Sequence, residues 1–273
     1  MNPDTKRYWI GKMERKKIAE QHARKMGSLY YDEILKSVLH SKIFRITEWY
    51  PEAVAKLGGN RYEKTTQKVI DADSVTAIFN STCDKNVCVM NFSSYKNPGG
   101  QFLNGSSAQE ESLCHESNLF NVLENPLNRE KFYDINKRDS NRCLYTNAIL
   151  WTPDIVFLRD GIERKCNVIT CAAPNATAAQ KYYKVPYAEI RSIMEQRIAL
   201  VLLCAVICGV DVLIAGAYGC GVFGNMPEDV ANTFKTLIDT TFNGCFKEVV
   251  YAVPSWSKEN YEAFITIFNS GVE

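Results

Sequence analysis

The chain has 273 residues, 46% of them hydrophobic and 23% charged, and is long enough to bury a substantial core. Its 32 Lys and Arg balance 31 Asp and Glu, and a formal net charge of +1 excludes an overall field that attracts duplex nucleic acid or an anionic membrane. We therefore expect that any bound anion is held by local groups. We also expect a monomer with no membrane partner and no sequence-specific nucleic-acid binding.

The ten cysteines are irregularly spaced and lack the short Cys-x-x-Cys or Cys/His pattern of a zinc site. We expect no structural metal. The first residues, Met1 to Arg7, lack the apolar core of a signal peptide, so a reducing, intracellular compartment, cytoplasmic or nuclear, is predicted. The most hydrophobic stretch, Ile198 to Val210, is shorter than the ~20 residues needed to cross a bilayer and predicts a buried helix.

In chain order, apolar residues at helical spacing first predict two helices between Lys12 and His40, with a break near Gly27 and Ser28. We interpret residues 1–60 as an N-terminal helical extension packed on the core and residues 61–273 as the main domain. Short runs of apolar and β-branched residues then predict strands buried on both faces of a sheet. These strands are Lys68–Asp71, Val87–Phe92, Leu144–Trp151, Asn167–Cys171, Val212–Ala215 and Glu248–Ala252.

Helical patterns lie between the predicted strands, over Ser112–Leu123, Glu189–Val210 and Pro227–Phe242. The segment from Ala172 to Glu189 reads as an exposed connection. Strands that alternate with helices predict an α/β sandwich with a mixed or mostly parallel sheet. In such sheets, ligands bind in the loops beyond the carboxyl ends of the strands.

The loop after Val87–Phe92 carries Asn97-Pro98-Gly99-Gly100 and then Gln109-Glu110-Glu111 at an expected helix start. The two glycines allow positive φ angles and close approach of the backbone, which would leave amides free for an anion. Two glutamates in a first helical turn can simply complement the helix dipole. Alternatively, one carboxyl is pushed toward protonation by its neighbour and by a bound anion, and then acts as a general acid.

The loop after Val212–Ala215 has four glycines within the nine residues from Gly216 to Gly224. One interpretation is a mobile turn. The other is a backbone cradle for a diphosphate, assisted by the positive end of the helix that starts at Pro227. The pattern is neither a Walker loop nor the Gly-x-Gly-x-x-Gly of a first βαβ unit.

Together, the two loops resemble the signatures of the poly(ADP-ribose) glycohydrolases, most of all their compact microbial type. The resemblance implies a macrodomain-like, three-layer α/β/α sandwich with a mixed central sheet, and it makes residues 61–273 the catalytic domain. It implies Glu111 as the catalytic acid/base and Glu110 as the ribose anchor. It also implies a set of substrate-binding residues: Asn97, Gly99, Gly100, Gln109, Gly216, Tyr218, Gly219, Cys220, Gly221, Val222 and Phe223, with Phe223 against the distal ribose.

The function that follows is hydrolysis of an O-glycosidic bond, either ribose–ribose or ADP-ribose–acceptor, with release of ADP-ribose and without a cofactor. The substrate would be poly(ADP-ribose) or an ADP-ribosylated macromolecule. Gln101 departs from the family pattern, because it stands where the signature has its third glycine. Two alternatives remain open: a macrodomain reader that binds ADP-ribose without turnover, and a hydrolase limited to single ADP-ribose units on protein or nucleic acid.

Overall fold

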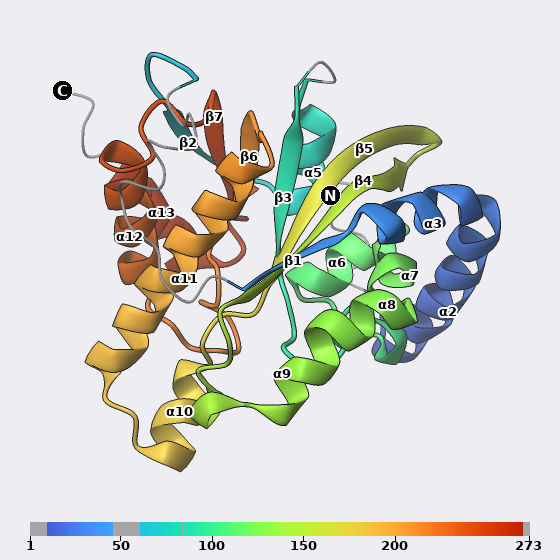
Figure 1. Ribbon diagram of the computed structural model, residues 1–273, viewed down its shortest axis with the longest axis horizontal. Coiled ribbons are helices and arrows are strands. Elements are labelled where there is room, and N and C mark those ends of the chain that lie inside the picture. The colour runs from blue at the N-terminus through green and yellow to red at the C-terminus, as the bar shows by residue number, and fades with distance from the viewer. Residues whose placement is uncertain (1–9, 46–60, 83–84, 270–273) are drawn as a thin grey trace.

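The computed structural model describes residues 10–45, 61–82 and 85–269. Within these residues, seven strands form one sheet in the order β1-β4-β5-β3-β6-β7-β2 (Figure 1). Strand β4 is antiparallel to β1 and β5, and the remaining neighbours are parallel. The predicted mixed sheet is confirmed. The strands are β1 (Lys42–Arg45), β2 (Thr66–Ile70), β3 (Val87–Phe92), β4 (Ala148–Arg159), β5 (Ile162–Cys171), β6 (Val212–Ala215) and β7 (Glu248–Ala252).

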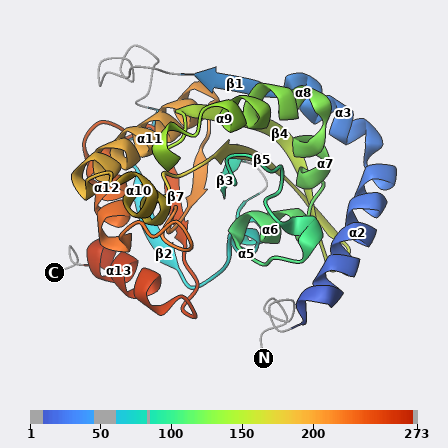
Figure 2. The same cartoon turned by 90° about the horizontal axis from the view of Figure 1, so that it is seen from below.

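Helices cover both faces of the sheet and complete the predicted three layers (Figures 1 and 2). One layer contains α11 (Tyr187–Ile207), α12 (Pro227–Asp239) and α13 (Lys258–Asn269). The opposite layer contains α2 (Lys12–Leu29), α3 (Tyr31–His40), α5 (Ser74–Asn80), α6 (Gln109–His115) and α7 (Leu119–Glu124). Shorter elements are η2 (Phe102–Asn104), α8 (Pro126–Asn128), η3 (Arg129–Asp134), α9 (Ile135–Arg138), η4 (Asn141–Cys143) and α10 (Ala176–Tyr183).

Strand β3 shows why the apolar runs of the sequence form central strands, whose two faces are both buried. Successive side chains of a strand point to opposite faces. Cys88 and Met90 therefore lie in the core under α11 and α12, whereas Val89 lies in the core under the opposite helices. The predicted buried helix over Ile198–Val210 is confirmed in the second half of α11, which ends at Ile207. Among the described helices, none has both the length and the apolar character to span a membrane.

Three predictions differ from the structure in instructive ways. The strand predicted from Leu144 begins only at Ala148, because several residues just before it have left-handed φ angles that are incompatible with strand pairing, Tyr145 at +60° among them. The predicted helix Ser112–Leu123 is two helices, since Ser117 forms a β-bridge to Phe157 between them. The predicted exposed connection contains helix α10.

Strand β1 was not predicted, and it pairs with β4 at one edge of the sheet. Residues 42–45 thus join the central sheet, although they belong to the segment interpreted as a helical extension. The proposed boundary between residues 60 and 61 adjoins residues 46–60, which lie outside the described residues. The division into extension and catalytic domain stays a prediction.

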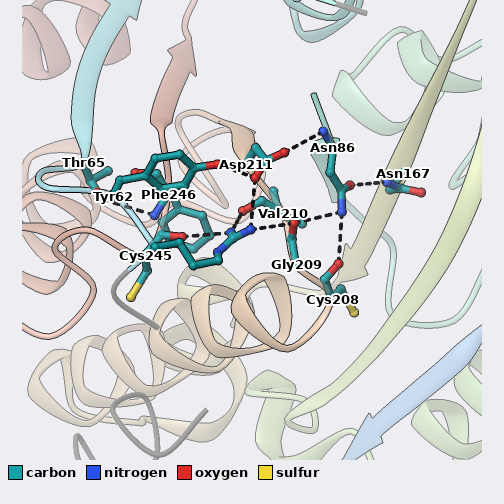
Figure 3. Close-up of polar contacts among 11 residues, drawn as sticks. Tyr62, Thr65, Asn86, Asn167, Cys208, Gly209, Val210, Asp211, Cys245 and Phe246 are labelled. Atoms are coloured by element: carbon teal, nitrogen blue, oxygen red, sulfur yellow. Dashed lines mark hydrogen bonds and ion pairs between the residues drawn. The ribbon is translucent and has the colours of Figure 1, made fainter. Parts of the chain in front are cut away.

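A polar network fastens the amino ends of β3 and β6, at the edge of the sheet away from the glycine-rich loops (Figure 3). Asp211 accepts hydrogen bonds from Arg61 Nη1 at 3.0 Å, from Tyr62 Oη at 2.5 Å and from the Asn86 amide at 3.0 Å. Burial acts to raise the pKa of Asp211, but the hydrogen bonds from Tyr62 and Asn86 and the charge of Arg61 outweigh it and lower the pKa.

Candidate active site

The two glycine-rich loops follow the carboxyl ends of β3 and β6, which are neighbours in the sheet. A cavity of about 340 Å³ lies between them. Its lining includes Ala108 and Gln109 from the first loop and Gly219, Gly221 and Phe223 from the second. The structure therefore brings together the two motifs that the sequence singled out.

The two adjacent carboxylates are buried at the start of α6 and turn to different donors. Glu111 is 5% exposed, and its Oε1 accepts a hydrogen bond of 2.8 Å from the amide of Gln101. Glu110 is 3% exposed and accepts from the Ser94 amide at 2.7 Å and from Asn91 Nδ2 at 3.3 Å. Both carboxylates thus bind the loop after β3, in addition to standing in the first turn of a helix.

Burial raises the pKa of Glu110 well above its usual range. The hydrogen bond from the Ser94 amide works against this shift, the charge of Glu111 adds to it, and the hydrogen bonds from Asn91 and the Gly99 amide oppose it. Glu110 is thus favoured in its neutral form, in which its proton can serve as a hydrogen-bond donor to a ligand hydroxyl.

Gly99 and Gly100 have φ angles of +63° and +62°, the left-handed region in which glycine is favoured. A Cβ atom on Gly100 would lie 2.5 Å from Glu111 Oε1 and 2.8 Å from Glu110 Oε2. The backbone of Gly100 therefore packs against both carboxylates. The loop amides differ from the expectation that they would be free for a ligand anion, because the Gly100 amide donates to the Asn97 carbonyl and the Gln101 amide to Glu111.

Gln101 replaces the third glycine of the signature without disturbing this arrangement. Its φ of −110° is accessible to any residue, so the position does not require glycine. Its side chain is exposed and accepts a hydrogen bond of 2.8 Å from Asn104, while its backbone amide still reaches Glu111. The substitution leaves the carboxylate's backbone donor in place.

Both polar atoms of the Gln109 side-chain amide form hydrogen bonds that stabilise the site. Its Oε1 accepts from the Phe92 amide at 2.9 Å, and its Nε2 donates to the Met90 carbonyl at 2.8 Å and to Ser74 Oγ at 3.0 Å. The side chain thereby pairs with two backbone groups of β3 and fixes the start of α6. It also lines the cavity.

The second loop offers unoccupied backbone donors. Among the described residues, the amides of Gly219, Gly221, Val222 and Phe223 have no hydrogen-bond acceptor. Gly219 has a φ of +74°, and a Cβ there would lie 2.6 Å from the Cβ of Ala173. Consecutive amides without partners, ahead of the 13-residue helix α12, form the kind of backbone concavity that binds phosphates.

The side chains of this loop divide into buried and exposed. Tyr218 is fully buried against Phe92, with ring centroids 5.5 Å apart, and Cys220 is half-buried. Gly216 is packed against the Ala252 carbonyl, whereas Val222 is 88% exposed. Tyr218 therefore supports the loop from behind, and a ligand would meet the loop through its backbone.

Phe223 belongs to an aromatic wall that connects the two loops. Its ring lies 6.0 Å from that of Tyr145, which stacks at 4.0 Å on Tyr95 of the first loop. Tyr95 and Tyr145 were not predicted as site residues. Their positions in a polar loop and before a strand carry no pattern that distinguishes them from other tyrosines.

A third segment lines the cavity and was missed by sequence reasoning. It follows β7 and contributes Pro254, Trp256, Ser257 and Asn260, with Trp256 56% exposed. The signal that could have found it is position, because this segment also begins at the carboxyl end of a parallel strand. In the parts of the chain that the structure covers, no cluster of three or more His, Cys, Asp or Glu could hold a metal.

Comparisons with known proteins agree on one family. Residues 5–160 match the family described as "Microbial-type PARG, catalytic domain". The poly(ADP-ribose) glycohydrolase (PARG) of Thermomonospora curvata has a TM-score of 0.81 at 28% identity, over 93% of this chain and 99% of that one. The enzyme from Deinococcus radiodurans, in complex with ADP-ribose, has a TM-score of 0.77 at 30% identity, over 87% and 97%. A structure of the Thermomonospora enzyme with the inhibitor ADP-HPD has a TM-score of 0.79 at 28% identity, over 92% and 98%. No curated protein matches the chain.

Proposed function

The chain belongs to the microbial-type poly(ADP-ribose) glycohydrolases, and from this premise we propose that it releases ADP-ribose with Glu111 as the catalytic acid/base. The predicted family resemblance and macrodomain-like fold are confirmed, and the chain is an enzyme of the glycohydrolase kind. The observation that carries the catalytic proposal is the placement of Glu111, which the Gln101 amide holds at 2.8 Å and which lies in the first turn of α6 between the cavity-lining residues Gln109 and Ser112.

We place ADP-ribose along the cavity with its diphosphate on the unoccupied amides of the second loop, those of Gly219, Gly221, Val222 and Phe223. The adenosine then extends toward the segment after β7, where Trp256 offers an exposed aromatic face. The distal ribose extends the other way, toward Glu110 and Glu111. Phe223, at the wall between the loops, packs against that ribose.

In the proposed reaction, the carboxyl group of Glu111 gives its proton to the oxygen that leaves C1″ of the distal ribose. The bond between C1″ and that oxygen breaks, and positive charge develops at C1″ and the ring oxygen. The carboxylate of Glu111 then takes a proton from a water molecule, whose oxygen bonds to C1″. The products are ADP-ribose and the free hydroxyl of the leaving group, and Glu111 returns to its starting form.

Glu110 has a separate role in this proposal. Its neutral form, favoured by burial, can donate a hydrogen bond to a hydroxyl of the distal ribose while its other oxygen keeps the Ser94 amide. Glu110 then positions the distal ribose so that its C1″ faces Glu111. One carboxyl for anchoring and one for proton transfer differ from the facing pair of ordinary glycosidases.

The direct test compares Glu111→Gln with Glu14→Gln, which makes the same chemical change on the exposed surface of α2. The readout is release of ADP-ribose from chain-length-resolved poly(ADP-ribose). We expect Glu111→Gln to lose ~10²–10⁴-fold in rate and Glu14→Gln to match the wild type. Equal rates for the two variants would remove Glu111 from the mechanism.

A non-catalytic reader is the second candidate function, and Gln101 is the residue that favoured it in the sequence. The intact contact between the Gln101 amide and Glu111 supports turnover instead. Binding of ADP-ribose by the wild type, without release of ADP-ribose from any substrate, would establish the reader.

The choice of substrate is a separate proposal. We favour poly(ADP-ribose) over single ADP-ribose units, since the family match names that polymer's glycohydrolase. Parallel time courses with the polymer and with mono-ADP-ribosylated protein or nucleic acid distinguish the two. Release from the single-unit substrates alone would show the restricted hydrolase.

The intracellular monomer remains part of the proposal. The nine cysteines within the described residues are free thiols, which supports a reducing compartment. Light scattering coupled to size-exclusion chromatography tests the monomer directly, since a dimer would double the 30.9 kDa mass.

A further inference from the structure

Arg197 is a fully buried cation in the middle of α11. Its guanidinium donates hydrogen bonds to three oxygens: Asn147 Oδ1 at 2.9 Å, the Leu144 carbonyl at 3.0 Å and the Ala172 carbonyl. All three acceptors are neutral. Arg197 is therefore well supplied with hydrogen bonds, but none of them brings a negative charge.

A buried charge is normally paired with an opposite charge, because removal of an ion from water is otherwise strongly unfavourable. Among the described residues, no carboxylate forms an ion pair with Arg197. An arginine side chain cannot escape this situation by losing its proton, since its pKa is too high. Within the part of the chain that the structure describes, Arg197 is thus a buried positive charge without a counter-charge.

This charge acts on a residue of the second glycine-rich loop. Tyr218 of that loop is fully buried beside the guanidinium, together with the thiol of Cys171. Burial raises the pKa of Tyr218, the neighbouring Cys171 adds to the shift, and the charge of Arg197 opposes it. Tyr218 is followed in sequence by Gly219, the first of the residues with unoccupied amides.

The Ala172 carbonyl that accepts from Arg197 provides a second connection. The next residue, Ala173, is packed closely against Gly219, where a Cβ would lie 2.6 Å from the Ala173 Cβ. The guanidinium and the amide cradle are therefore joined through one layer of packed residues. Within a low-dielectric interior, a charge so placed is weakly screened from the loop.

We propose that Arg197 is an electrostatic positioning residue whose missing counter-charge is supplied by the diphosphate of the bound ligand. This inference rests on the proposed binding of ADP-ribose to the second loop. The amides of that loop make the direct contacts, and Arg197 raises the affinity for a dianion from behind them. Its charge should favour ADP-ribose over an uncharged ligand that fills only the adenosine end of the cavity.

A purely structural role is the competing explanation, because Arg197 also fastens the segment before β4, where Asn141, Arg142, Cys143 and Tyr145 have left-handed φ angles. Removal of Arg197 would disturb both functions at once. Asn147→Asp separates them. It keeps the acceptor at Nε and nearly the same side-chain shape, yet it places a counter-charge next to Arg197, at a half-buried position.

The experiment measures the affinities of the full chain for ADP-ribose and for adenosine by calorimetry. The matched control is Asn80→Asp, which changes the net charge equally at the exposed end of α5. We expect Asn147→Asp to weaken ADP-ribose binding ~10-fold relative to Asn80→Asp, and to leave adenosine binding within about twofold. Thermal unfolding confirms that both variants are folded.

Arg197→Gln is the second variant, and the same selective loss of ADP-ribose affinity is expected from it. Equal loss for both ligands, or no loss relative to Asn80→Asp, would overturn the electrostatic role. A wild-type chain that fails to bind ADP-ribose would instead refute the proposed function. Normal wild-type binding with unaffected variants would refute only the inference about Arg197.

Discussion

Gly100→Ala is the sharpest test of how the first loop positions Glu111, the proposed catalytic group. The added methyl group has no free space, since its carbon would lie 2.5 Å from Glu111 Oε1 and 2.8 Å from Glu110 Oε2. The φ of +62° adds a backbone penalty for any residue with a Cβ. The substitution thus acts on the fold and on the position of both carboxylates.

The two effects differ in size. The left-handed conformation costs alanine about 1 kcal/mol in free energy of unfolding. Ordinary van der Waals contact begins near 3.4 Å, so the Glu111 oxygen must retreat by roughly 0.9 Å. A misplacement of about 1 Å can reduce a catalysed rate ~10²-fold. We therefore expect a large loss of turnover with a modest loss of stability.

Gly161→Ala is the matched control. Gly161 lies in the turn between β4 and β5 with a φ of +80°, and a Cβ there has nothing within 4 Å. It carries the backbone penalty without the collision. The assay compares poly(ADP-ribose) hydrolysis and thermal unfolding for both variants. If Gly100→Ala hydrolyses the polymer as fast as Gly161→Ala, the backbone of residue 100 does not position Glu111.

Three further predictions concern other parts of the molecule. Gly219→Ala should weaken ADP-ribose binding at least ~10-fold in calorimetry, because its Cβ would collide with Ala173. Gly221→Ala has open space at its Cβ and should keep the wild-type unfolding temperature. Tyr62→Phe should lower the free energy of unfolding by ~2 kcal/mol at pH 7, since it removes a donor to a charged carboxylate (Figure 3), and wild-type unfolding would contradict this. Because the pKa of Asp211 is lowered in the folded state, its stabilising contribution is present above the unfolded-state pKa and is lost as the pH falls through the folded-state pKa. In urea unfolding between pH 7 and pH 3, Tyr62→Phe should therefore lose less stability than the wild type.

The central strands could be predicted from the sequence because strands that are buried on both faces consist of uninterrupted apolar residues. Strands β3, β6 and β7 occur at their predicted bounds. Strand β1 has only two apolar residues, Ile43 and Phe44, and becomes a strand through its pairing with β4. No local sequence pattern predicts this pairing. The delayed start of β4 has the same origin, because the segment before it, which contains the left-handed residues, is held by tertiary contacts such as the hydrogen bond from Arg197 to the Leu144 carbonyl.

The candidate site was predictable where its chemistry lies in contiguous motifs. Glycines next to Gln-Glu-Glu indicated a close approach of the backbone, and Gly100 does pack against both carboxylates. Trp256 escaped prediction because it is one aromatic residue in an ordinary loop, and only the fold brings it to the cavity. Arg197 escaped it because an arginine beside an apolar helical run suggests a residue at the polar boundary of the helix.

The two loops use their backbone amides in opposite ways, and this difference explains how the site can bind a polyanion beside an acid. In the first loop, the amides of Ser94 and Gln101 are already occupied by Glu110 and Glu111, so the carboxylates are held before any ligand arrives. In the second loop, the amides of Gly219 and of residues 221–223 remain available. In the proposed complex, a diphosphate therefore finds its donors there and not at Glu110 and Glu111. The proposal thus holds the negative charge of the substrate at the second loop, while Glu111, as the proposed acid, keeps a fixed position for the bond to be cleaved, as preorganised catalysis requires.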